Sequence, residues 1–161
     1  MKNTFDAGCA IEAVGLVKTY PQGRGRTPVR ALGGLSLEVA DGTVFALLGP
    51  NGAGKSSTVK ILTTLSRPDG GRATVAGVDV VANPDAVRRL IGVVPQRSSS
   101  DPVASARENL LLQGRIHGLG RRHARHRCDE LLARFGLVEA ADRPVRTYSG
   151  GMARRLDVAL G

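Results

Sequence analysis

The sequence predicts an α/β fold built on a mixed sheet, and three consecutive features carry that prediction. Residues 44–48 (VFALL) are a short apolar run, typical of a strand buried on both faces of a parallel sheet. The glycine-rich stretch that follows has too few side chains to form a strand or a core helix. Residues 54–66 then repeat apolar side chains at helical spacing. The sequence therefore predicts a strand, a glycine loop and a helix in direct succession.

The glycine loop has the form G-x-x-x-x-G-K-[ST], which is the pattern of a phosphate-binding loop. Glycines reach backbone angles that let successive N–H groups converge on phosphate oxygens, and the start of a helix adds further donors. Lys55 supplies a positive charge for the β- and γ-phosphates, and the Ser56 hydroxyl suits Mg²⁺. The predicted nucleotide-binding residues of this loop are Gly49, Pro50, Asn51, Gly52, Ala53, Gly54, Lys55, Ser56 and Ser57.

The segments before the loop predict an antiparallel sheet that leans on the parallel one. Residues 1–9 are expected to form a loose leader, and residues 11–16 a first strand. Residues 29–32 and 35–39 are two further strand candidates, the second with the apolar–polar alternation of a half-buried strand.

After the loop helix, residues 73–81 predict a strand interrupted at Gly77. Residues 83–90 predict a helix with Asn83 as its N-cap and Pro84 at its first position. Residues 91–94 are a short apolar run that predicts a strand closed by Pro95-Gln96.

The remaining chain predicts helices. Residues 105–116 begin with Ser105 and carry Glu108 three positions later, which is a capping-box pattern. Residues 121–135 predict a second helix with one apolar stripe, and a third helix runs to Gly161. We therefore expect one domain over 1–161, with a sheet core at 10–96, a helical subdomain at 97–148 and a final segment at 149–161.

The composition of the chain does not select one class of binding partner. The 161 residues carry a net charge of +9, mostly from arginine, which indicates either a solvated basic surface or attraction to an anionic partner. The two cysteines, Cys9 and Cys128, read as reduced thiols. His123, His126 and Cys128 offer one alternative, a metal site, but a basic solvated helix face is the preferred interpretation. That face could contact lipid head groups or a membrane subunit.

Three further features say little about function when taken one at a time, but their order along the chain is informative. Tyr20 precedes the loop, Gln96 closes the strand after it, and Tyr148-Ser149-Gly150-Gly151-Met152 follows the helical stretch. With the segments LVKTY, LLGPNGAGKSS, RPDGG, VVPQ, ENL and TYSGGM in this order, residues 11–161 resemble the ATP-binding subunit of an ABC transporter, in its drug-exporting, daunorubicin-type branch.

The resemblance implies an ABC-type P-loop NTPase fold and a role for each matching residue. Tyr20 would stack on adenine, and Gln96 would reach Mg²⁺ and the attacking water, so Lys55 and Gln96 are the predicted catalytic residues. Ser56 and Gln96 are the predicted Mg²⁺ ligands. The predicted signature, which would hold the γ-phosphate of ATP bound to the opposite subunit, is Ser149, Gly150, Gly151 and Met152, the last replacing the glutamine of the broader family.

The resemblance also implies cofactors, partners and a location. ATP and Mg²⁺ are the expected cofactors, and a second nucleotide-binding subunit paired head to tail and a transmembrane permease are the expected partners; no specific nucleic acid is expected. The expected location is cytoplasmic, on the inner face of the cell membrane through the permease, with ATP hydrolysis powering export of a small hydrophobic compound.

Beyond the signature helix the family continues to an Asp-Glu strand and a switch histidine, whereas this sequence stops at Gly161. We therefore expect a fold that is incomplete at its C-terminus and little or no turnover by this chain alone. Two alternatives stay open, a soluble ABC-type ATPase acting on nucleic acid or the ribosome, and a non-catalytic nucleotide-binding fragment.

Overall fold

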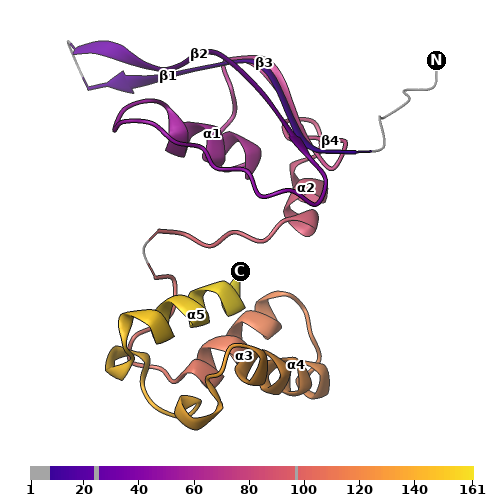
Figure 1. Cartoon of the computed structure of the whole chain (residues 1–161), viewed down its shortest axis with the longest axis vertical. Helices are drawn as coiled ribbons and strands as arrows, with labels where there is room; N and C mark the ends of the chain where they lie inside the picture. Colours follow the sequence, from indigo (N-terminus) through magenta and orange to yellow (C-terminus); the bar gives the residue numbers. More distant parts are fainter. Residues whose placement is uncertain (1–7, 24–25, 97) are drawn as a thin grey trace. The chain divides into compact units, whose positions relative to one another are not determined.

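The structure, a computed structural model, describes residues 8–23, 26–96 and 98–161 (Figure 1). It divides into two compact units, the first ending at Ile91 and the second beginning at Gly92, and each is described by itself. Residues 1–7 of the expected leader lie outside the described residues, and Cys9, at its end, already belongs to the first strand.

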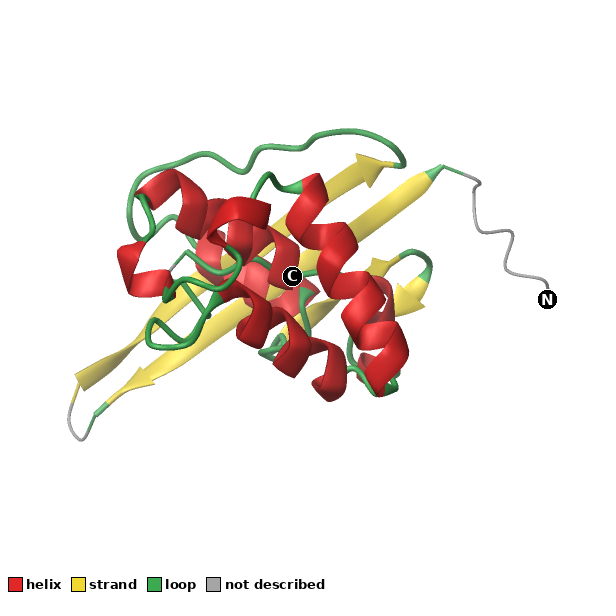
Figure 2. Cartoon of the chain, turned by 90° about the horizontal axis from the view of Figure 1, so that it is seen from below, coloured by secondary structure: helices red, strands yellow, loops and turns green. Residues whose placement is uncertain are grey.

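The first unit is organised on a four-stranded antiparallel sheet in the order β2-β1-β3-β4. Its strands are β1 (Cys9–Gln22), β2 (Arg26–Ala40), β3 (Gly70–Val75) and β4 (Val78–Asp79), and the two long strands β1 and β2 are conspicuous in Figure 2. The predicted antiparallel part of the fold is therefore confirmed. The two strands predicted at 29–32 and 35–39 form one continuous strand, β2.

Two helices complete the first unit: α1 (Lys55–Leu62) and α2 (Pro84–Leu90). Both begin where the sequence predicts, but α1 ends four residues before the predicted residue 66, because Thr64 takes a left-handed φ of 62° that a helix cannot continue through. Pro84 lies in the first turn of α2 as predicted, whereas Asn83 is at the N-cap without a side-chain hydrogen bond. The buried core of this unit is apolar because one face of the sheet and one stripe of each helix meet there. Its residues are Ala13, Leu16, Leu32, Ile61, Ala73, Val75, Val80 and Val87.

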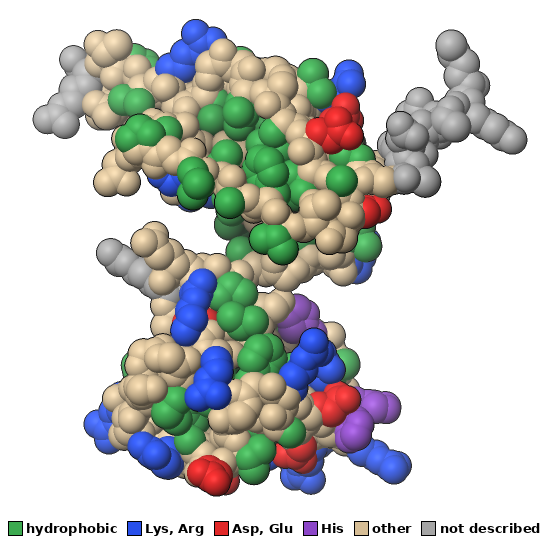
Figure 3. Space-filling view, viewed as in Figure 1, with side chains coloured by type: hydrophobic (Ala, Val, Ile, Leu, Met, Phe, Trp, Pro, Cys, Tyr) green, Lys and Arg blue, Asp and Glu red, His purple; other side chains and the backbone are tan. Residues whose placement is uncertain are grey.

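Two strand predictions are wrong. Residues 44–48 and 91–94 are extended chain that belongs to no sheet. A strand of a parallel sheet forms only when neighbours supply its hydrogen bonds, and the sheet of the described residues contains antiparallel pairs only. Val44 is consequently 100% exposed and Leu48 87%. Figure 3 shows hydrophobic side chains gathered on one face of this unit.

The second unit is helical. It contains α3 (Ala106–Ile116), α4 (Arg121–Arg134), two short 3₁₀ turns at Val138–Ala140 and Val145–Thr147, and α5 (Gly150–Leu160). The three long helices confirm the predicted helical stretches. Their apolar stripes meet in one core, whose buried residues are Ala106, Leu110, Cys128, Leu132, Leu137, Ala141, Val145 and Leu156.

The start of α3 is fixed by the predicted capping box. The Ser105 hydroxyl accepts from the Glu108 N–H at 3.2 Å, and the Glu108 carboxylate accepts from the Ser105 N–H at 2.7 Å. These bonds satisfy two of the donors that a helix start leaves unpaired. The Ser105 N–H, and then its hydroxyl, hold the pKa of Glu108 below its usual value. This stabilisation is therefore present at neutral pH and is lost as the pH falls through the lowered pKa.

We expect Ser105→Ala to lower the free energy of unfolding of the chain by about 1 kcal/mol, because the Glu108 N–H loses its acceptor at the start of the helix. Chemical denaturation followed by circular dichroism measures the change. Ser99→Ala is the matched control, since Ser99 is exposed and precedes the helix. Equal stability of the two variants would show that the capping box contributes nothing to α3.

Candidate nucleotide-binding site

The predicted phosphate loop is an open turn between the extended segment and α1. Residues 49–53 are exposed, and the turn is closed by a bond from the Ala53 N–H to the Pro50 carbonyl at 3.2 Å. Gly52 has φ +87° and Gly54 φ +70°, which are left-handed conformations that side chains disfavour. The loop therefore takes a shape that its glycines permit and presents its backbone to solvent.

Gly54 is also a point of close contact with the sheet. It is the N-cap of α1, and a Cβ added there would collide with the Ala31 carbonyl oxygen and lie 2.7 Å from Leu32 Cδ2 on β2. The buried Thr58 hydroxyl donates to the Gly54 carbonyl at 2.9 Å. The glycine thus allows the start of α1 to approach β2 closely, which fixes the direction of the helix.

The Lys55 side chain folds back over the loop. Its Nζ donates to the Gly49 carbonyl at 2.8 Å and to the Pro50 carbonyl at 3.1 Å. The ammonium group therefore lies where the loop backbone converges, at the N-terminal end of α1. The first turn of α1, which the structure describes in full, carries no acidic residue. Loop, helix start and ammonium together form a site of positive potential suited to phosphate.

Tyr20 lies close to the same helix. The Ser57 hydroxyl, and then that of Ser66, lower the pKa of Tyr20, although its buried hydroxyl has no partner at hydrogen-bond geometry among the described residues. Lys18 Nζ lies 5.5 Å from the centre of the Tyr20 ring, a cation–π contact. The structure thus brings Tyr20 together with the end of the phosphate loop. Its stacking on adenine stays a prediction.

Lys18 is held in turn by a residue that sequence reasoning missed. The Asp69 carboxylate accepts from Lys18 Nζ at 2.8 Å and from the Thr19 N–H at 2.6 Å. The bond from Lys18, and then that from the Thr19 N–H, lower the pKa of Asp69. Asp69 therefore supports the backbone immediately before Tyr20. No local pattern indicates this role, because the two segments are about fifty residues apart in the sequence.

The predicted signature lies at the start of α5 in the second unit. Ser149 is the N-cap, and its hydroxyl accepts from the Met152 N–H at 3.3 Å. Ser149, Gly150 and Gly151 are exposed, and a Cβ at either glycine would meet open space. The first turn of α5, described in full, carries no acidic residue. This helix start is therefore a second surface to which an anion could bind.

Two other residues of the second unit, Gln96 and Tyr148, belong to the predicted motifs. Gln96 is exposed in the extended chain that precedes α3. The Tyr148 hydroxyl donates to the Ala140 carbonyl at 2.6 Å, and burial raises its pKa, so it remains a donor at neutral pH. This bond fixes the chain immediately before Ser149.

The alternative metal site gains no support. Cys128 is buried in the core, where burial raises the pKa of its thiol, whereas His123 and His126 are exposed on α4. Over the described ranges, no three His, Cys, Asp or Glu side chains come together as a metal-binding group. The Ser56 hydroxyl, next to Lys55 in the sequence, is exposed at the start of α1 and is an oxygen of the kind that Mg²⁺ accepts.

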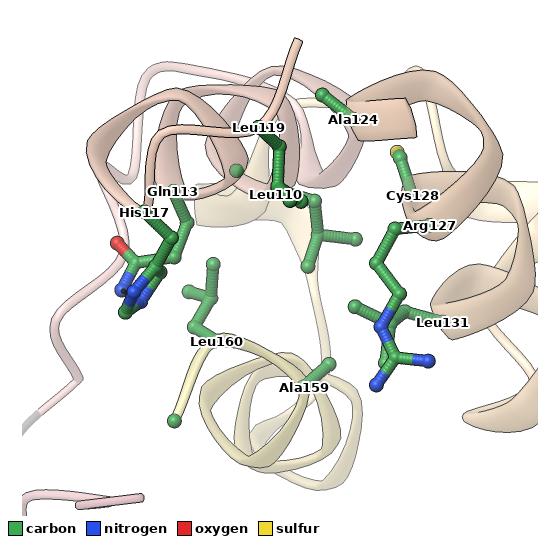
Figure 4. Close-up of a pocket in the computed structure, with 12 residues that line it drawn as sticks. Leu110, Gln113, His117, Leu119, Ala124, Arg127, Cys128, Leu131, Ala159 and Leu160 are labelled. Carbon is green, nitrogen blue, oxygen red and sulfur yellow. Dashed lines mark hydrogen bonds between the residues drawn. The ribbon is translucent and has the colours of Figure 1, made fainter. Parts of the chain in front are cut away.

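The second unit also contains a pocket of about 230 Å³ between α3, α4 and the end of α5 (Figure 4). Leu110, Leu131 and Leu160 contribute apolar surface, while the Gln113 amide and the His117 ring lie 3.1 Å apart at its edge. None of the described residues that line the pocket belongs to the predicted nucleotide site.

Comparison with known proteins agrees with this arrangement. The family model of the ABC transporter domain matches residues 32–161. A daunorubicin/doxorubicin resistance ATP-binding protein, DrrA, of Streptomyces peucetius is 51% identical over 150 residues, which are 93% of this chain and 44% of that protein. A doxorubicin resistance ATP-binding protein, DrrA, of Mycobacterium tuberculosis is 49% identical over 152 residues, which are 94% of this chain and 45% of that protein. The chain thus spans less than half the length of these curated relatives.

A solved structure is also similar. The ATP-binding cassette MJ0796, as a dimer in a post-hydrolysis state bound to ADP and Pi, matches with a TM-score of 0.77 at 25% identity, over 93% of this chain and 68% of that chain. Within the described residues, every helix is too short or too polar to cross a bilayer. On the evidence of the phosphate loop, the helix-start signature and these matches, the chain belongs to the ABC transporter family.

Proposed function

We propose that the chain binds Mg-ATP at the phosphate loop and acts as the nucleotide-binding part of an exporter of small hydrophobic drugs. The observation that carries the proposal is the Lys55 ammonium, which lies over the loop carbonyls at the N-terminal end of α1. In that position it needs only to exchange two carbonyl partners for phosphate oxygens, which bind an ammonium more strongly.

Mg²⁺ would be held by the Ser56 hydroxyl and the Gln96 side-chain oxygen together with phosphate oxygens, since this ion prefers oxygen ligands and accepts few from protein. When bound, it would neutralise charge that develops on the phosphates during transfer. Lys55 and the loop N–H groups would hold the β- and γ-phosphates, and Tyr20 would stack on adenine. Gln96 would orient the attacking water.

The start of α5 supports a role for a second copy. Its exposed Ser149, Gly150 and Gly151 offer N–H groups and a hydroxyl with open space before them, so a phosphate held by another subunit could approach closely. We propose a head-to-tail pair in which each signature completes the site of the other copy, docked on a transmembrane permease at the inner face of the membrane.

The exported compound is proposed from the relatives alone. Those that match at about half identity are named for resistance to daunorubicin or doxorubicin. The proposal therefore specifies a small hydrophobic drug as cargo, with ATP hydrolysis by the complete protein as the source of energy.

Gly151→Ala tests the proposal because it separates folding from function. Its Cβ meets open space in α5, so alanine is expected to stabilise the helix by up to about 1 kcal/mol. The same methyl group would block the approach of a partner's phosphate. We expect drug efflux by cells carrying the complete transporter to fall at least about 10-fold, which corresponds to about 1.4 kcal/mol. Thermal unfolding of the purified chain checks its stability.

Gly120→Ala is the matched control. Gly120 is the N-cap of α4 in the same unit, has φ −63°, and a Cβ there would also meet open space. Efflux should be unchanged in this variant. If Gly151→Ala left efflux intact, the role of the α5 start in binding a second nucleotide would be wrong.

A further inference from the structure

Two side chains of α5 form hydrogen bonds on either side of Gln96, one with the backbone before it and one with a side chain after it. Arg154 Nη1 donates to the Pro95 carbonyl at 2.8 Å, immediately before Gln96. The Ser98 hydroxyl donates to Asp157 Oδ1 at 2.7 Å, two residues after it. Gln96 itself is exposed, but it is flanked along the chain by two contacts, and both come from the helix that begins at the signature.

Asp157, which accepts the second of these bonds, is buried. The residue is 4% exposed, and its carboxylate lies 4.0 Å from the Arg154 guanidinium on the same helix. A buried carboxylate requires hydrogen-bond donors to offset its loss of hydration. The Ser98 hydroxyl is such a donor, so displacing Ser98 from Asp157 carries a cost that an exposed contact would not. Ser98 is thereby held against α5.

The chain before Gln96 also follows α5 closely. A Cβ added at Gly92 would lie 2.5 Å from the Gly161 carbonyl oxygen at the end of this helix. Gly92 thus lies against the end of α5, and Arg154 and Asp157 hold Pro95 and Ser98 further along the helix. Because α5 has 11 residues and rises about 1.5 Å per residue, these contacts extend over much of its length.

We propose that Arg154 and Asp157 are positioning residues that tie Gln96 to the signature helix, so that Gln96 and Ser149–Gly151 move as one body. This inference rests on the proposed function of the site, which it deepens by naming what couples its two parts. A phosphate that binds at the start of α5 would then fix the segment that carries Gln96. Binding of ATP at the phosphate loop does not itself require the Arg154–Pro95 and Ser98–Asp157 contacts.

Backbone ¹⁵N NMR relaxation in the whole chain tests the attachment without any nucleotide. In Arg154→Gln, we expect the order parameters of the amides of residues 92–94, 96 and 98 to fall from about 0.85, typical of a rigid backbone, to below about 0.6, typical of a flexible one. Arg155→Gln is the matched control, because the neighbouring Arg155 donates to the Phe135 carbonyl at 2.9 Å instead. It should lower the order parameters near Phe135 and leave those of the segment around Gln96 unchanged. Identical patterns in the two variants would overturn the attachment.

A second pair of variants tests Asp157. Asp157→Asn keeps an oxygen that can accept from the Ser98 hydroxyl, whereas Asp157→Ala removes it. We expect low order parameters for the same amides in Asp157→Ala and near-normal values in Asp157→Asn. Adding Ser98→Ala to Asp157→Ala should then change nothing further, since the two groups act as one contact. Additive effects of the two substitutions would refute the contact.

Turnover by the complete transporter tests the coupling itself. In Arg154→Gln we expect kcat for ATP to fall about 10-fold with KM unchanged, because the phosphate loop still binds ATP and the contact acts on Gln96. Arg155→Gln should leave both constants near normal. A rise in KM with unchanged kcat would overturn the proposal. Failure of the wild-type chain to bind ATP would instead refute the proposed function, while the relaxation results would still decide the attachment.

Discussion

Lys55→Ala is expected to weaken binding of ATP to the chain about 100-fold, a loss of about 3 kcal/mol for one charged partner of the phosphates. The reason is specific to its geometry. Lys55 Nζ already lies within hydrogen-bond distance of the Gly49 and Pro50 carbonyls, at the centre of the loop. Removing it deletes the point charge where the β- and γ-phosphates would lie. Isothermal titration calorimetry with Mg-ATP measures the change.

Arg72→Ala controls for the loss of a positive charge from the same unit. The Arg72 side chain on β3 is 68% exposed, and its Nη2 lies 3.7 Å from Glu12 Oε1 in a surface ion pair. Because such exposed charges contribute little, its removal should change the affinity for ATP less than about 2-fold. If Lys55→Ala bound ATP as tightly as the wild type, the assignment of the phosphate loop would be wrong. Equal losses in both variants would mean that ATP responds to net charge alone.

The patterns that predicted structure correctly are local ones. The sequence predicted the helix after the loop, and the structure places its start at Gly54, where a left-handed glycine permits the turn. Ser105 and Glu108 predicted a capping box, and both of its hydrogen bonds are present. In each case the residues that decide the conformation lie within four positions of one another, so their interaction is visible in the sequence.

The strand prediction for 44–48 was wrong for a physical reason. An apolar run reports that a segment prefers burial, but a strand also needs partners for its backbone groups. Among the described residues, the sheet contains only antiparallel pairs, and none of them includes this segment. Val44 and Leu48 therefore remain exposed although their side chains suit a core. Composition could predict the burial preference and not the pairing.

The supports of the predicted site residues were beyond sequence reasoning for a related reason. Tyr20 was predicted from its place in a motif, but the bonds that Lys18 and Thr19 donate to Asp69 join segments far apart in the chain. The contacts of Arg154 with Pro95 and of Asp157 with Ser98 are of the same kind. Asp157, an acidic residue next to the apolar Leu156 in the predicted helix, was the one signal in the sequence. It indicates that a hydrogen-bond donor meets a buried carboxylate, but it does not identify Ser98 as that donor.

Gly54→Ala is expected to destabilise the chain by about 3 kcal/mol, which lowers the melting temperature by about 15 °C for a unit of this size. Two costs combine at this position. Gly54 has φ 70° and ψ 32°, where an added side chain is strained. Its Cβ would also collide with the Ala31 carbonyl of β2, so that either the sheet or the start of α1 must shift. Thermal unfolding followed by circular dichroism measures the loss.

Gly52→Ala isolates the first cost, because Gly52 also has a left-handed φ, +87°, but a Cβ there would meet open space. We expect it to lower stability by only about 1 kcal/mol, the penalty of the backbone conformation alone. Its methyl group would nevertheless lie on the exposed side of the loop, where phosphate would approach in the proposed function, so the affinity for ATP should fall while the fold persists. Equal destabilisation by the two variants would show that the contact between Gly54 and β2 does not determine the position of α1.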